Sequence, residues 1–159
     1  MTFKTADLCD DHADELQIAE PLFCDYGGLV AFCGPIATVK AFEDNSQVRI
    51  ALETPGRGRV LVVDGGGSRR CAMVGDQLAL LAHNNDWNGI VMYGCIRDAK
   101  DIAEIPIGLK ALATHPLKSQ KRNEGQRDIP VRFAGVDFIP GHHLYGDSDG
   151  VVTSAVALI

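Results

Sequence analysis

Residues Arg59-Val60-Leu61-Val62-Val63-Asp64 give the clearest strand signal of the sequence, and Gly65-Gly66-Gly67 interrupts it at once. A short, continuous and β-branched apolar run that ends in glycine is typical of a buried strand. Helical periodicity follows over residues 71–83, and a second apolar run, Gly89-Ile90-Val91-Met92-Tyr93, comes after it. Strand, helix and strand within about 40 residues indicate a βαβ unit with a parallel strand pair. The sequence therefore predicts an α/β fold with this unit at its centre.

Further elements are expected on both sides of the unit. Helices are predicted over residues 5–16, with Thr5 as N-cap, over residues 45–52, and as a short acidic segment after Asp98. Two strands, 29–33 and 36–42, are expected on either side of a Gly34-Pro35 turn. Short strand-like runs divided by glycine and proline fill the C-terminal third, at residues 111–114, 131–133, 136–139 and 151–156. We interpret residues 1–159 as one α/β domain whose second half is richer in strand.

The composition limits the classes of partner. A chain of 159 residues that is 46% hydrophobic suits one globular domain, and its net charge is −6. It has no basic block of the kind that binds a phosphate backbone, and the basic stretch 118–127 also contains Glu124 and Gly125 and is interpreted as a solvated loop. No apolar run approaches the roughly 18 residues that span a bilayer, and no signal-peptide core follows Met1. We expect a cytoplasmic protein that binds neither nucleic acid nor membrane directly.

The five cysteines are widely spaced and form no C-x-x-C motif, so the sequence indicates neither a disulfide framework nor a zinc site. Most are expected to be small buried apolar residues. Cys95, two positions before Arg97, is the one candidate for a reactive thiol, because a nearby cation can lower the pKa of a thiol.

The stretch Gly94-Cys95-Ile96-Arg97-Asp98 places a cation beside a carboxylate where the second apolar run ends. In open α/β folds, ligands bind at such strand ends. Asp98 is suited to a hard divalent cation, and the planar fork of Arg97 is suited to a carboxylate or a developing enolate. The alternative is a surface ion pair or a turn, which is common and weak.

A second motif, Gly75-Asp76-Gln77-Leu78, lies one helix upstream. A glycine inside a helical stretch is unfavourable, so the helix either begins or kinks at Gly75. If it begins there, the free N–H groups of residues 75–78 form an anion site suited to the carboxylate of a 2-oxo acid. Asp76 would then act as an acid–base group or simply as an N-cap.

A right-handed crossover brings both strand ends to one side of the sheet. We therefore expect Arg97, Asp98 and Asp76 to converge with the amides of residues 75–78. Together they would supply a metal ligand, a cation and an anion-binding terminus, which suits polarisation of a 2-oxo acid and stabilisation of its enolate.

The glycine triplet 65–67 stands between a predicted strand and a predicted helix, where glycines let backbone N–H groups approach an anion. It matches neither the G-x-G-x-x-G fingerprint nor the P-loop with its Lys-Ser/Thr ending. A turn whose glycines adopt positive φ is the alternative to nucleotide binding, and we favour it.

Several segments carry a family resemblance. They are Thr5-Ala6-Asp7-Leu8-Cys9-Asp10, Glu20-Pro21-Leu22-Phe23, the run from Gly56 to Gly67, Gly75-Asp76-Gln77-Leu78, Gly94-Cys95-Ile96-Arg97-Asp98 and His143-Leu144-Tyr145-Gly146-Asp147. With these motifs the chain resembles the regulator of ribonuclease activity A (RraA-like) family, which merges with the divalent-metal 4-hydroxy-4-methyl-2-oxoglutarate aldolases. The resemblance implies a compact α/β/β swivelling-type domain that assembles as a ring-shaped homotrimer.

The resemblance also implies roles for the site residues. Asp98 would bind Mg²⁺ or Mn²⁺, and Arg97 would bind substrate and support the enolate. Gly75, Asp76, Gln77 and Leu78 would hold the pyruvyl group, and Asp76 would order water near the base position. Because the chain keeps both carboxylates, the resemblance favours an enzyme over a pure regulator.

The leading prediction is a metal-dependent lyase. It would cleave 4-hydroxy-4-methyl-2-oxoglutarate and decarboxylate oxaloacetate through a shared pyruvate enolate. Longer aldolases of the family carry a C-terminal acidic residue for the neighbouring subunit, which is absent before Ile159. Decarboxylation of oxaloacetate needs no such base, only the Lewis acid and the groups that hold the enolate. The alternatives are a non-catalytic trimer that binds and inhibits ribonuclease E, for which an acidic surface is suited, and a trimer with a vestigial site.

Overall fold

The strand predicted over residues 59–64 forms β4 (Val60–Asp64), in which every residue is buried. In the computed structural model, which describes residues 2–159, β4 lies parallel to β3 (Phe32–Lys40) on one side and to β6 (Gly89–Ile96) on the other. β6 also pairs in parallel with β7 (Gly108–Thr114) and with the short β5 (Ala72–Val74). The predicted parallel strand pair is therefore confirmed, and it is part of a larger parallel sheet.

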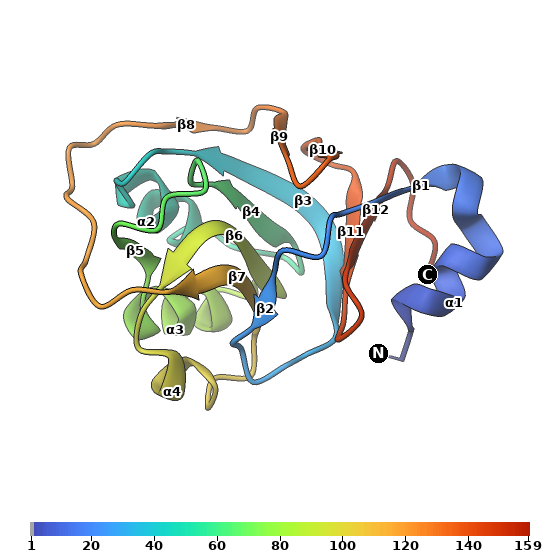
Figure 1. The fold of residues 1–159 in the computed structure, drawn as a ribbon, viewed down its shortest axis with the longest axis horizontal. Helices are drawn as coiled ribbons and strands as arrows, with labels where there is room; N and C mark the ends of the chain where they lie inside the picture. Colours follow the sequence, from blue (N-terminus) through green and yellow to red (C-terminus); the bar gives the residue numbers. More distant parts are fainter. Residues whose placement is uncertain (1) are drawn as a thin grey trace.

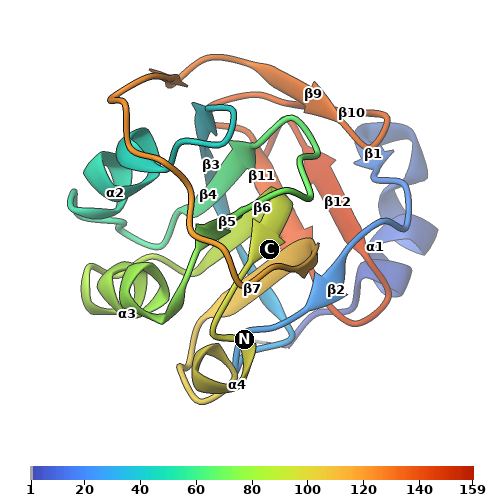
Figure 2. The same ribbon diagram turned by 60° about the vertical axis from the view of Figure 1, so that its left-hand side comes forward.

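Three helices cover one side of these parallel strands. They are α2 (Ser46–Leu52), α3 (Asp76–Asn84) and α4 (Ala99–Ile102), which lie together in Figure 1 and Figure 2. Their buried apolar side chains join one core with the strands: Val48, Ala51, Leu52, Leu78, Ala79, Ala82 and Ile102. This packing is what makes such short helices stable.

A second group of β-strands covers the other side. β1 (Leu16–Ile18), β12 (Val151–Ser154) and β11 (His143–Gly146) pair antiparallel in that order, and β11 pairs with β3. The hairpin of β9 (Val131–Phe133) and β10 (Val136–Phe138) packs beside them, and α1 (Thr5–His12) lies beyond β12 in Figure 2.

β4 shows how the layers are held together, because its side chains alternate between two cores. Leu61 and Val63 pack beneath the helices, whereas Val60 and Val62 pack against the β9–β10 hairpin. A strand that is buried on both faces has a continuous apolar sequence rather than an alternating one. The arrangement of helices, parallel sheet and β-layer agrees with the expected mixed α/β fold.

The prediction of a turn at Gly34-Pro35 is wrong, because β3 runs straight through it. Residues 32–35 pair with β11, and residues 36–40 pair with β4. Pro35 has no N–H to donate, and it lies where the strand changes from one partner to the other, so a proline is tolerated there. An added Cβ at Gly34 would also collide with the carbonyl oxygen of Gly58, so the close approach requires glycine.

Two predicted helices are too long. The helix expected over 5–16 stops at His12 as α1 (Thr5–His12), and a 3₁₀ turn (Ala13–Glu15) then leads into β1. The helix expected over 71–83 starts at Asp76, because residues 72–74 pair with β6 as β5. In both cases strand pairing outweighs the local helical pattern. The two-residue strands β2 (Cys24–Asp25) and β8 (Gln126–Arg127) were not predicted.

The glycine triplet after β4 is a turn, as we favoured. Gly66 and Gly67 have φ values of 67° and 70°. The N–H groups of Gly65 and Gly67 donate to the Tyr93 carbonyl, and that of Gly66 donates to the Asp64 carboxylate. Because these donors are used internally, the turn interpretation is confirmed and the three N–H groups are not offered to a nucleotide phosphate. Across residues 2–159, no helix is both long and apolar enough to cross a membrane.

Candidate active site

The two sequence motifs meet where β5 and β6 end. The N–H of Arg97 donates to the carbonyl of Val74 over 2.9 Å, which ties the end of β6 to the end of β5. Gly75 is the N-cap of α3, so the helix begins at this motif rather than kinking. A Cβ added to Gly75 would lie 2.8 Å from Asp98 Oδ2 and 3.5 Å from Arg97 Cγ. A side chain at position 75 would therefore displace the Asp98 carboxylate, and the expected convergence of the two motifs is confirmed.

Asp98 has a left-handed backbone conformation at the point where β6 gives way to α4. Its φ and ψ are 59° and 37°, the left-handed region that is unfavourable for a residue other than glycine. Its Oδ2 lies 3.8 Å from Arg97 Nε and accepts a long hydrogen bond of 3.4 Å from the N–H of Asp76. The Arg97 and Asp98 side chains are 41% and 37% exposed. Such an open ion pair contributes little to folding and leaves both groups accessible to a ligand.

Asp76 is the first residue of α3 and not its N-cap, so the N-cap alternative is wrong. Its Oδ1 accepts the N–H of Gln77 over 2.8 Å, and its Oδ2 accepts Gln77 Nε2 over 3.3 Å. The start of α3 therefore already faces two carboxylates of the chain, those of Asp76 and Asp98. A substrate carboxylate would share this terminus with them.

The carboxylates of Asp76 and Asp98 provide hard oxygen donors suited to Mg²⁺ or Mn²⁺. Among residues 2–159, no group of three or more His, Cys, Asp or Glu side chains forms a complete cage. Magnesium does not require one, because it is commonly held by one or two carboxylates and completes its shell with water and substrate oxygens. Asp98 therefore fits a cation whose remaining ligands come from outside the chain, whereas both Asp76 oxygens already accept from Gln77.

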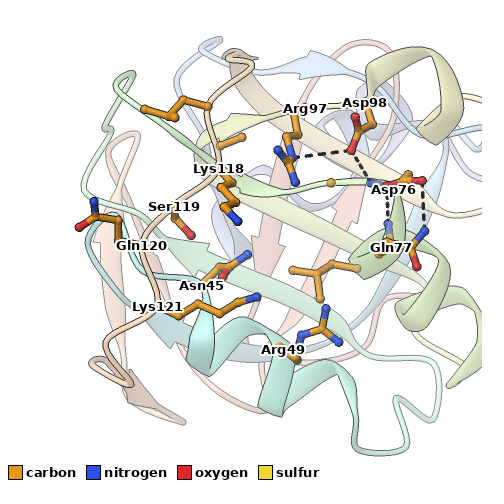
Figure 3. A pocket seen from close by; sticks show the side chains of 14 residues that line it. Asn45, Arg49, Asp76, Gln77, Arg97, Asp98, Lys118, Ser119, Gln120 and Lys121 are labelled. Carbon is orange, nitrogen blue, oxygen red and sulfur yellow. Dashed lines mark hydrogen bonds and ion pairs between the residues drawn. The ribbon is translucent and has the colours of Figure 1, made fainter.

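Both motifs line one cavity of about 520 Å³ (Figure 3). We call the residues Gly75–Leu78, Arg97 and Asp98 the first wall. The second wall, on the opposite side in Figure 3, consists of Asn45, Arg49, Lys118, Ser119, Gln120 and Lys121. Sequence reasoning missed the second wall and interpreted residues 118–127 as a solvated loop.

Asp44 anchors the segment that follows the second wall. Its buried carboxylate accepts the N–H groups of Arg122 (2.7 Å) and Glu124 (3.1 Å), as well as the N–H and hydroxyl of Ser46 at 2.9 and 2.6 Å. Burial alone would raise the pKa of Asp44, but these hydrogen bonds outweigh it and lower the pKa to about 2. The carboxylate is thus ionised at any ordinary pH. The one signal in the sequence was an Asp-Asn-Ser run before a helix.

Cys95 is not a reactive thiol. It is 1% exposed, and burial raises its pKa, so the thiolate is disfavoured. The nearby cation that opposes this shift is Arg69 rather than Arg97. Among the described residues, no cysteine or histidine lines the cavity.

The chain is similar to known proteins over nearly its whole length. The family model described as RraA-like, Aldolase/RraA, matches residues 5–153. Proteins of Aromatoleum aromaticum and Laribacter hongkongensis are each 58% identical over 159 residues, with both chains fully covered. Both carry the provisional name 4-hydroxy-4-methyl-2-oxoglutarate aldolase.

Two solved structures share the fold. One, described as an S-adenosylmethionine:2-dimethylmenaquinone methyltransferase from Geobacillus kaustophilus, is 52% identical with a TM-score of 0.96, over 98% of this chain and 97% of that one. The RNA-processing inhibitor RraA from Thermus thermophilus is 42% identical with a TM-score of 0.94, over 98% and 94%. Because relatives with this fold bear three different functional names, the activity has to be argued from the site.

Proposed function

The chain belongs to the RraA-like family, and on that premise we propose that it is a divalent-metal-dependent carbon–carbon lyase acting on 2-oxo acids. The observation that carries the proposal is the convergence of Arg97, Asp98 and Asp76 at the start of α3 in one cavity. The substrates would be 4-hydroxy-4-methyl-2-oxoglutarate, which yields two molecules of pyruvate, and oxaloacetate, which yields pyruvate and CO₂. The provisional aldolase name of the 58% identical relatives supports this reaction class.

Each group of the first wall would have a distinct task. Asp98 would hold Mg²⁺ or Mn²⁺, and the bound cation would supply Lewis-acid polarisation of the 2-oxo acid. The guanidinium of Arg97 would bind the pyruvyl oxygens and stabilise the negative charge that develops as the C–C bond breaks. Gln77 and Leu78 at the start of α3 would orient the pyruvyl group, which would share the N–H groups of Asp76 and Gln77 with the carboxylates that accept from them now. Asp76 would also orient a water molecule near the reacting carbon.

Both reactions would pass through the same enolate. In decarboxylation, the C–C electron pair moves into the enolate as CO₂ leaves, and a proton from water then completes pyruvate. In retro-aldol cleavage, the same electrons move, but the 4-hydroxyl must also lose its proton. No carboxylate besides Asp76 and Asp98 lines the cavity among residues 2–159, so decarboxylation would be the faster reaction. We further propose that the chain acts as a homotrimer in the cytoplasm.

The test is a pyruvate-release assay. Purified protein would be mixed with oxaloacetate and Mg²⁺, with or without EDTA, and pyruvate would be followed with a coupled dehydrogenase after subtraction of the rate with Mg²⁺ alone. We expect Asp98→Ala to lower the rate by at least about 100-fold, because it removes the central cation ligand. Asp101→Ala, which removes an exposed carboxylate from α4 outside the cavity, is the matched control. Equal rates for wild type and Asp98→Ala would refute the proposal.

A second candidate is inhibition of an endoribonuclease, which the 42% identical RNA-processing inhibitor favours. The net charge of −6 suits a basic, RNA-binding partner such as ribonuclease E. A pull-down against ribonuclease E tests it, and Asp98→Ala should bind as well as wild type because regulation would not use the cation site. Recovery of no ribonuclease from either protein would argue against this function.

A further inference from the structure

The segment that forms most of the second wall begins with a turn at His115 and Pro116. β7 ends at Thr114, and the run from Leu117 to Lys121 lines the cavity. The N–H of Leu117 donates to Nδ1 of His115 over 3.1 Å, so the imidazole closes the turn. Pro116 between them has a fixed φ and no N–H of its own. His115 therefore lies where the chain leaves the sheet and turns into the wall.

This hydrogen bond fixes the protonation state of His115. A backbone N–H can only donate, so Nδ1 must accept through its lone pair, and the ring is neutral with its proton on Nε2. Protonation of Nδ1 would replace the acceptor with a second donor and break the bond. Histidine is the side chain that ordinarily changes charge between about pH 5 and pH 8. The turn is therefore closed by a bond that acid removes.

Two backbone hydrogen bonds carry the position of the turn into the cavity. The Leu117 carbonyl accepts the Ala72 N–H over 2.7 Å, and the Ser119 N–H donates to the Ala72 carbonyl over 3.1 Å. These bonds lie on either side of Lys118, which forms a parallel bridge with Ala72. The orientation of the Leu117 peptide therefore decides where the Lys118 side chain enters the cavity.

Lys118 brings a positive charge to the wall that faces the candidate cation site. Its side chain extends into the cavity in Figure 3, and Arg49 and Lys121 lie on the same wall. A 2-oxo dicarboxylic acid whose 2-oxo group lies at Arg97 and Asp98 would direct its second carboxylate toward these cations. The affinity for such an acid should therefore depend on where Lys118 is held.

The ionisable groups around His115 leave it as the one that changes charge near neutral pH. Its N–H donates to the Ile96 carbonyl over 2.9 Å at the end of β6, and β7 lies between β6 and β2. β5 (Ala72–Val74) has no ionisable side chain. The neighbouring elements contribute Cys24 and Asp25 of β2, Tyr93 and Cys95 of β6, Arg97 and Asp98 just beyond it, Lys110 of β7 and Lys118 of the segment. Side chains of these types ordinarily keep one charge state between about pH 5.5 and pH 7.5.

We propose that His115 is a positioning residue. Its neutral imidazole holds Leu117 and thereby sets Lys118 for the second carboxylate of a 2-oxo dicarboxylic acid, so that acid weakens binding by opening the turn. This inference rests on the proposed function, because it places the 2-oxo group on the first wall. His115 does not line the cavity, so it acts on the ligand through the backbone of the segment. A turn with a merely structural role would leave the affinity independent of the charge on His115.

The test rests on His115→Asn. The amide oxygen of asparagine accepts the N–H two residues further on in an Asx-turn, and it does not change charge with pH. The Kd of 2-oxoglutarate with Mg²⁺ would be measured by ligand-observed NMR at about pH 7.5 and about pH 5.5. In wild type, the Kd should rise about threefold at the lower pH, which is the size of one solvent-exposed hydrogen bond. His115→Asn should keep the low Kd at both pH values, and His115→Ala should show the raised Kd at both.

His83→Asn is the matched control, because His83 is an exposed histidine of α3 that lies outside the cavity. This variant should keep the pH dependence of wild type. With oxaloacetate as substrate, KM should follow the same pattern as the Kd, whereas kcat should differ between wild type and His115→Asn by less than about twofold, because His115 touches no reacting atom.

Three outcomes would each overturn the inference. They are an equal pH dependence of the Kd in wild type and His115→Asn, a Leu117 amide NMR signal that does not titrate together with the His115 ring, and no binding of 2-oxoglutarate at either pH. If the Kd follows the expected pattern but no pyruvate is released from oxaloacetate with Mg²⁺, the proposed function fails and the role of His115 in binding the acid stands.

Discussion

The two walls of the cavity are built in different ways. The first wall consists of residues at the ends of β5 and β6 and at the start of α3, so the parallel sheet itself fixes their positions. In the second wall, Asn45 and Arg49 come from the start of α2, and residues 118–121 form an irregular segment. This segment is held by β5 at one end, where Ala72 and Ser119 share a backbone hydrogen bond, and by the Asp44 carboxylate at the other. The first wall depends on regular backbone pairing, whereas the irregular segment of the second wall also depends on the buried side chain of Asp44.

This difference predicts how substitutions in each wall will affect activity and stability. A change in the first wall should alter chemistry without loosening the fold, because the sheet remains paired. A change at the anchor of the second wall should alter substrate affinity and stability together. Three variants test the comparison.

Gly75→Ala should have the largest effect on the rate. The new Cβ would lie 2.8 Å from Asp98 Oδ2, while the φ of Gly75, −121°, is one that alanine adopts freely. The protein should therefore fold, with the Asp98 carboxylate displaced. Because a misplacement of about 1 Å in a reacting group can cost about 100-fold in rate, we expect a loss of that order in metal-dependent pyruvate release.

Gly150→Ala is the matched control for this variant, since a Cβ at Gly150 would meet nothing within 4 Å. It should release pyruvate at the wild-type rate. Thermal melting would show whether Gly75→Ala is folded. A folded Gly75→Ala variant with undiminished activity would show that the first wall does not depend on the position of the Asp98 carboxylate.

The same difference explains what could be predicted from the sequence. The first wall was predictable because strand and helix signals fix where a βαβ unit ends, and its charged residues lie at those ends. The second wall was not, because Asp44 bonds to Arg122 and Glu124, which are 78 and 80 positions away, and no local pattern reveals such a contact. Pro35 misled the prediction for a similar reason, since its tolerance depends on which strand lies beside it.

Asp44→Asn should have the next largest effect on catalysis, and it should also lower the stability of the fold. An amide cannot accept four hydrogen bonds as the carboxylate does, so either the N–H groups of Arg122 and Glu124 or the N–H and hydroxyl of Ser46 lose their partner. We expect the free energy of unfolding to fall by about 2 kcal/mol and KM for oxaloacetate to rise about tenfold. Asp147→Asn is the control, because Asp147 is a buried carboxylate that bonds Thr5 and Asp149 away from the cavity. It should lower stability but leave KM unchanged.

The pH dependence of stability provides a second test of whether the Asp44 carboxylate anchors the second wall. The pKa of Asp44 is about 2 in the folded protein, below its ordinary value of 3.8. A carboxyl with a lowered pKa stabilises the fold fully above its unfolded pKa, and this stabilisation is lost as the pH falls through the folded pKa. Between about pH 4 and pH 2, the melting temperature of wild type should therefore fall more steeply than that of Asp44→Asn. Parallel slopes would mean that Asp44 does not anchor the second wall as an ionised group.

Lys121→Met should have the smallest effect on catalysis of the three variants. It tests whether Lys121 acts on the substrate through its charge or holds the second wall in place. Lys121 is exposed and lines the cavity, so its attraction for a substrate carboxylate is screened by water and salt. We expect KM for oxaloacetate to rise about threefold at low ionic strength and the difference from wild type to disappear near 0.5 M salt, where the Debye length is only about 4 Å. Lys4→Met, which removes an exposed lysine just before α1, should show no such salt dependence. A salt-independent rise in KM would instead mean that Lys121 holds the loop in place, and the second wall would then depend on more than Asp44.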